Sequence, residues 1–123
     1  MVIFGEEYGF MLTIGASAEI AELCPDGDLS RIEEVLDEKK LSQVINFTAH
    51  LCEAMAKGFD DAKRFRGEQV THKPLTAEMV LALQKDEFKY VQAAAIAAFR
   101  GDTETTVEVA PSKKKESQEK ELN

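Results

Sequence analysis

The residues best suited to chemistry in this 123-residue chain are its two cysteines and two histidines. On a helix predicted over residues 41–65, His50 and Cys52 are two positions apart and therefore lie about 200° apart around the axis. Such a pair cannot converge on one metal ion. Cys24 and His72 would have to come from distant loops to complete a zinc site. The spacing therefore favours a cysteine in the core and a histidine on the surface.

A second group of polar residues partly matches a calcium-binding loop. Positions 1, 3, 5 and 12 of the EF-hand pattern are filled by Asp26, Asp28, Ser30 and Asp37. Position 6 of that pattern needs glycine, whereas Arg31 stands there, and position 12 should be a bidentate glutamate. An ordinary turn followed by a helix cap explains the same residues, so no calcium site is predicted.

The chain contains none of the common motifs for nucleophilic catalysis or nucleotide binding, namely GxSxG, the P-loop and GxGxxG. A Cys–His nucleophile pair is compatible with the composition, but no local pattern marks one. The acid pairs Glu33-Glu34 and Asp60-Asp61 are adjacent in sequence, so their side chains point apart on a helix and are predicted on solvated faces. The sequence therefore assigns no catalytic residue, no metal ligand and no cofactor, and predicts a protein that is not an enzyme.

Three aromatic residues fall beside the predicted core faces and are the candidates for contact with a partner protein. They are Phe47, Phe65 and Tyr90. Exposed aromatic side chains are enriched where proteins bind one another. The alternative for the same rings is that they cover the edge of the core.

The elements that must position these residues are mainly helical. Near the N-terminus, alternating apolar residues predict a β-hairpin with arms at residues 2–4 and 8–13 and a turn at Gly5-Glu6-Glu7; the residues that share one parity are Val2, Phe4, Tyr8, Phe10, Leu12 and Ile14. Apolar residues at helical spacing predict helices over about residues 16–23, 29–38, 41–65 and 87–100. A further helix is predicted to begin after a cap at Thr76. The expected fold is a mainly α, compact helical domain of four or five helices with a small N-terminal β-hairpin, over residues 1–100.

Charge is distributed unevenly along the chain, whose formal net charge is −8. Residues 1–40 hold ten acids and three bases, a net charge of −7. Residues 41–100 hold seven acids and eight bases (+1), and residues 101–123 hold six acids and four bases (−2). This balance does not favour nucleic acid or an anionic membrane surface as a partner. No apolar run is long enough to predict a transmembrane helix, and no basic region of a signal peptide opens the chain. Two cysteines are too few for a disulfide framework, which suits a reducing cytoplasm.

The opening stretch VIFGEEYGFMLTIGASAEIAELCPDGDLSRIEEVL resembles the start of tail assembly chaperones of long-tailed bacteriophages and prophages. Members of that family open with a short Gly-turned hairpin, here at Gly5. A Gly-Ala junction, here Gly15-Ala16, then leads into an acidic helix, here Glu19 to Glu22. The later LTAEMVLALQKDEFKYVQAAAIAAFRG is similar to their C-terminal helical part. The resemblance covers about residues 1–100.

The resemblance implies a non-catalytic protein that binds tail tube and tape measure proteins during tail assembly. It implies action in the host bacterial cytoplasm and absence from the mature virion, and it allows a homo-oligomer. In many relatives a ribosomal frameshift extends the protein, and codons for Lys113-Lys114-Lys115 can form a slippery A-rich run. The alternative for these lysines is a solvated charged tail. The alternative function is a small helical regulatory or adaptor subunit of a bacterial complex, and a third is an enzyme that uses Cys52 or His50.

Residues 101–123 are predicted to form a flexible charged tail, with the short TTVEV at residues 105–109 as an exception. From Pro111 onward the segment holds one aliphatic residue, Leu122, so it offers no face to bury. Truncation after Ala110 is therefore expected to change the free energy of unfolding by no more than about 1 kcal/mol in a thermal melt. A clearly larger loss would mean that this segment packs on the domain.

Overall fold

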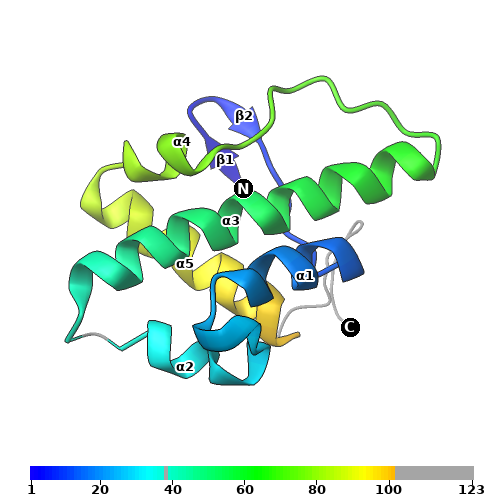
Figure 1. Cartoon of the computed structure of the whole chain (residues 1–123). Helices are drawn as coiled ribbons and strands as arrows, with labels where there is room; N and C mark the ends of the chain where they lie inside the picture. Colours follow the sequence, from blue (N-terminus) through cyan, green and yellow to red (C-terminus); the bar gives the residue numbers. More distant parts are fainter. Residues whose placement is uncertain (38, 102–123) are drawn as a thin grey trace, which may run out of the picture.

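The computed structural model describes residues 1–37 and 39–101, and it confirms the mainly helical fold with a small N-terminal hairpin (Figure 1). The elements in chain order are β1 (Val2–Ile3), β2 (Glu6–Glu7), α1 (Ile14–Glu22), the 3₁₀ turns η1 (Pro25–Gly27) and η2 (Leu29–Arg31), α2 (Ile32–Val35), α3 (Leu41–Phe65), α4 (Ala77–Leu81) and α5 (Lys85–Arg100). The expected tail and the lysines at 113–115 lie outside the described residues, so the division into a domain and a tail stays a prediction. Among the described residues, no helix combines the length and apolar character needed to cross a membrane.

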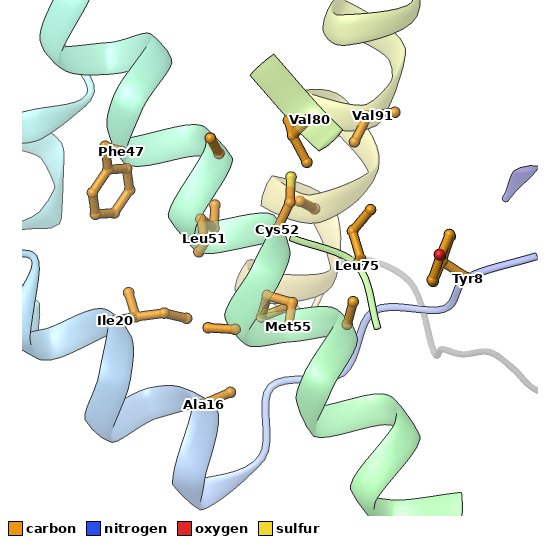
Figure 2. Packing of buried hydrophobic residues seen from close by; sticks show 14 of the residues in the cluster. Tyr8, Ala16, Ile20, Phe47, Leu51, Cys52, Met55, Leu75, Val80 and Val91 are labelled. Carbon is orange, nitrogen blue, oxygen red and sulfur yellow. The ribbon is translucent and has the colours of Figure 1, made fainter. Parts of the chain in front are cut away.

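The long helix α3 is the centre of the fold, and it begins and ends where its periodicity predicts. Helices α1, α4 and α5 all pack against it. Figure 2 shows Leu51, Cys52 and Met55 of α3 between Ile20 of α1 and Val80 of α4. Because neighbours lie on more than one side, α3 buries more residues than a single helical stripe would hold.

The N-terminal hairpin is shorter than predicted and has a different turn. Val2 pairs with Glu7 and Ile3 with Glu6, which leaves Phe4-Gly5 as a two-residue turn. Both turn residues have positive φ, 48° and 80°, as a type I′ hairpin turn requires. The side chains of Val2 and Phe4 are therefore more than half exposed, whereas that of Ile3 is buried.

The prediction that residues 8–13 form the second strand is wrong. This segment pairs with no strand and instead runs along α3, where the Met11 N–H donates a hydrogen bond to the Met55 carbonyl oxygen at 3.1 Å. Helix α1 then begins two residues before its predicted start, because Thr13 Oγ1 caps it by accepting from the Ala16 N–H at 3.0 Å. Ile14, which shares the parity of the alternating apolar residues, is 89% exposed in the first turn of α1.

The helix predicted over residues 29–38 is broken into shorter pieces. Asp28 caps η2 as expected, since its carboxylate accepts from the Ser30 N–H at 3.0 Å. Helix α2 ends at Val35. The Asp37 carboxylate accepts from the Lys39 N–H at 3.0 Å, a local turn that competes with continued helix.

The start of α4 follows the predicted capping chemistry, whereas α5 begins at Lys85, two residues before its predicted start, with a capping box between Gln84 and Glu87. Thr76 Oγ1 accepts from the Met79 N–H at 3.2 Å, and Leu75 and Val80, which stand at the positions of a hydrophobic staple, are both buried. Helix α5 ends at Gly101, whose φ of 75° is the left-handed conformation that glycine adopts without strain.

Gly58 lies where the N-terminal segment crosses α3, and it should not tolerate a larger side chain. A Cβ at this position would lie 2.8 Å from Thr13 Oγ1 and 2.9 Å from the Met11 carbonyl oxygen. We expect Gly58→Ala to lower the free energy of unfolding by about 1–3 kcal/mol in urea titration, even though alanine favours helix. Gly15→Ala in α1 is the control, because the nearest atom to its Cβ is 3.9 Å away. Equal behaviour of the two variants would contradict the close approach.

Candidate functional site

A groove of about 800 Å³ lies between α3 and α5 and extends to α2; we call it the α3–α5 groove. Its apolar lining comes from all three regions: Leu36, Leu41, Val44, Ile45, Phe88 and Ile96. Its polar lining residues are Glu33, Lys85, Lys89, Gln92 and Arg100. A concave site with apolar lining and a few polar groups is the usual form of a binding site.

One face of α5 supplies most of this lining, through residues three or four positions apart. Two polar contacts link α5 to α3 and α2 beside the groove. The Gln92 side-chain amide donates to Thr48 Oγ1 of α3 at 3.0 Å, which satisfies a fully buried hydroxyl. At the other contact, the Arg100 guanidinium pairs with the Glu33 carboxylate of α2 at 3.1 Å. The groove is therefore bordered by helices that are fixed to one another.

The groove is positively charged within an acidic chain. Three cationic side chains and one carboxylate line it, which gives a local excess of two positive charges, whereas the whole chain carries −8. Arg100 is paired with Glu33, but within the described part of the chain no carboxylate lies within 4 Å of the Lys85 or Lys89 amine. Neither amine is therefore paired with a carboxylate of the described residues, and both can meet acidic groups of a ligand.

The three aromatic candidates do not form one surface. Phe47 is 4% exposed and belongs to the core, so its expected place beside the core face is wrong; α3 is buried on more than one side there. Phe65 and Tyr90 are 92% and 69% exposed, but neither lines the groove. Figure 1 shows the last turns of α3, which end at Phe65, extending away from α5. The apolar groove residues of α3 and α5 belong to the helical spacing from which these helices were predicted, and that spacing does not separate a groove from a core. The signal that could have found the groove is the pair of lysines at 85 and 89, one turn apart beside Phe88.

Neither cysteine is placed to act as a nucleophile. Cys52 is fully buried, and burial raises the pKa of its thiol to about 12. Cys24 is also buried, its pKa is raised chiefly by burial, and its Sγ donates to the Ile20 carbonyl oxygen at 3.5 Å. A reactive cysteine needs an accessible thiolate. The prediction of a cysteine in the core and a histidine on the surface is confirmed, because Cys52 is buried and His50 is exposed.

The polar residues considered for metal binding are used in local structure. The Arg31 guanidinium pairs with the carboxylates of Asp26 and Glu34 at 2.6 and 2.7 Å, while Asp28 forms its cap. Across residues 1–37 and 39–101, no three histidine, cysteine or acidic side chains gather as a metal site would require.

A buried polar cluster of Asp60, His72 and Tyr8 was missed by sequence reasoning, which placed Asp60 on a solvated face. Asp60 is 3% exposed, and both carboxylate oxygens lie within hydrogen-bond distance of His72 Nε2, at 2.9 and 3.0 Å. The Tyr8 ring packs against the His72 imidazole with ring centroids 4.5 Å apart. The Tyr8 hydroxyl donates to the Lys73 carbonyl oxygen at 2.8 Å. Asp61, the adjacent acid, faces outward and pairs with Arg64.

The cluster borders a second cavity of about 490 Å³, lined among others by Tyr8, Phe59 and His72. An Asp–His pair can orient an imidazole as a general base, but hydrolysis also needs a nucleophile and oxyanion donors. Among the described residues, His72 Nδ1 makes no hydrogen bond that would mark such a nucleophile. The contacts instead join three distant segments, the N-terminal arm, α3 and the loop before α4.

Breaking the Asp60–His72 pair should destabilise the domain, because the partner that remains is a buried polar group. We expect His72→Ala and Asp60→Asn each to lower the free energy of unfolding by about 1–3 kcal/mol. The double variant should lose clearly less than the sum of the two, because both changes remove the same interaction. Chemical denaturation of the three variants measures this. Additive losses would show that the pair does not connect the loop to α3.

Comparison with known proteins leaves the function to be inferred from the chain itself. No protein family, no curated protein and no solved structure matches it. The α3–α5 groove and the Asp60–His72–Tyr8 cluster are the two features from which a function can be inferred, and the groove is the larger of the two cavities described above.

Proposed function

We propose that this chain is a tail assembly chaperone of a long-tailed bacteriophage or prophage. In this role it binds tail tube and tape measure proteins without catalysis, in the host bacterial cytoplasm, and it is left out of the mature virion. The sequence resemblance over residues 1–100 supports the proposal. The observation that carries it is the α3–α5 groove, an apolar surface suited to a segment of another protein.

The groove offers the kind of affinity that an assembly chaperone needs. Burying two or three apolar side chains of a partner yields roughly 1.5–3 kcal/mol each. Association itself costs about 4 kcal/mol or more, so these side chains alone leave at most about 5 kcal/mol, a Kd of about 0.2 mM, and tighter binding needs other contacts. A partner held this weakly can be released when the tail polymerises.

Leu41 is the groove residue best placed for first contact with a partner. It is 65% exposed at the first position of α3, although its neighbours Val44 and Ile45 are buried or half-buried. When a ligand covers a leucine that is exposed at the mouth of an apolar groove, apolar surface is removed from water and the complex is stabilised.

The alternative proposal is a small helical regulatory or adaptor subunit of a bacterial complex. The same groove would then bind a different protein. Gene order separates the two proposals, since a tape measure gene is expected just downstream for a tail chaperone. An enzyme that depends on Cys52 or His50 is a third class, which a Cys52→Ala, His50→Ala double variant with full function would remove.

Leu41→Glu should weaken binding of purified tail tube or tape measure protein at least tenfold in isothermal titration calorimetry, where a tenfold change corresponds to about 1.4 kcal/mol. Leu41 is exposed, and glutamate is favourable in the first turn of a helix, so the fold should be kept. Ile14→Glu is the matched control, because Ile14 is also an exposed aliphatic residue in a first helical turn but lies outside the groove lining.

Phe65→Ala and Tyr90→Ala measure the contribution of the two exposed aromatic candidates in the same titration. No binding of either tail protein to the unaltered chain would overturn the proposed function. Binding that Leu41→Glu leaves unchanged would keep the function and place the site elsewhere.

A further inference from the structure

The charge of the α3–α5 groove indicates what kind of segment covers it. Beyond the Arg100–Glu33 pair, the described residues of the lining include the two lysines of α5 and no further acid. Lys85 and Lys89 are one turn apart, so they present two amines along one side of the groove. A segment that carries both apolar and acidic side chains is the complementary ligand.

The chain itself supplies such a segment next to the groove. Arg100 lines the groove, and Gly101 directly after it ends α5. Residues 102–110 follow with the sequence DTETTVEVA, which holds three acids, no base and two valines. In an extended segment Val107 and Val109 lie on one side and Glu108 on the other.

We propose that residues 102–110 bind in the α3–α5 groove of their own chain and cover it until a partner displaces them. The chain length fits this path. From Lys85 to Arg100, α5 spans about 22 Å, and nine extended residues span roughly 30 Å. The segment therefore has the length to return along the whole groove from Arg100 to Lys85.

Tethering makes even weak contacts sufficient for this arrangement. A short flexible link gives an effective concentration in the millimolar range, so a segment with a free Kd of about 0.1 mM would be mostly bound. The covering segment ends before Lys113-Lys114-Lys115, because three further cations are repelled by the lysines of the groove. A partner must then compete with the segment, a consequence that rests on the proposed function.

Paramagnetic NMR on the full chain tests the covered groove without any partner. A nitroxide is attached to Ser112→Cys, while Cys24 and Cys52 stay unmodified because they are buried. We expect the amide signals of two lining residues, Leu41 and Phe88, to lose more than half of their intensity; Phe88 lies twelve residues before Arg100 on α5. The amides of Asp61 and Lys63, near the C-terminal end of α3 and outside the groove lining, should keep theirs.

Variants in the segment and in the groove provide the controls. Val107→Asp with Val109→Asp should restore the signals, as should Lys85→Glu with Lys89→Glu, whereas Val107→Ile with Val109→Ile should not. Undiminished signals of Leu41 and Phe88 in the unaltered sequence would overturn the proposal. Signal loss in a mixture of isotope-labelled chains and separate spin-labelled chains would also overturn it, because the occupant would then be a second copy.

The consequence for partner binding is measured separately. If the segment competes, the Val107→Asp, Val109→Asp chain should bind tail tube or tape measure protein several-fold more tightly than the unaltered chain. Tail proteins that bind neither chain would overturn the proposed function, while the paramagnetic result would still decide whether the groove is covered. Equal affinity of the two chains would overturn the competition.

Discussion

The burial of α3 on opposite sides is the constraint on which the rest of this structure depends. Its middle turns carry Leu51, Cys52 and Met55, all buried, and no single neighbour could cover them. Helix α1 and the N-terminal segment cover one side and α4 and α5 another, which requires close approach of backbone at Gly58. The N-terminal segment and the long loop before α4 depend on this arrangement. The Met11 N–H donates to the Met55 carbonyl oxygen of α3, and the Tyr8 hydroxyl donates to the Lys73 carbonyl oxygen of the loop.

Sequence reasoning succeeded where the information is local. The bounds of α3 agree with the helix predicted over residues 41–65 from apolar residues at helical spacing, and the caps at Asp28, Thr76 and Gly101 follow from side-chain and backbone chemistry within a few residues. It failed where a distant segment decides the outcome. Residues 8–13 alternate like a strand, yet their Met11 N–H bonds to the Met55 carbonyl of α3 rather than to another strand.

The candidate site was less predictable than the fold, for a related reason. Every apolar groove residue was recognised as lying on an apolar helical face, but a groove is the part of such a face that no neighbour covers. Which part stays uncovered depends on how α2, α3 and α5 cross, and that depends on contacts such as Gln92 with Thr48. The same argument applies to Asp60, whose burial is decided by a histidine twelve residues away in a loop.

The placement of charge limits how the groove can choose its ligand. The chain is acidic as a whole, so an acidic segment is repelled at long range and attracted only near the lysines of α5. At physiological ionic strength the Debye length is about 8 Å, and the distant repulsion is largely screened. In the proposed function, recognition is therefore decided within the groove, by apolar side chains that fill it and by acids that reach Lys85 and Lys89. A ligand with only one of these two features gains little, because surface ion pairs alone contribute at most about 1 kcal/mol and an apolar segment alone leaves the two amines unpaired.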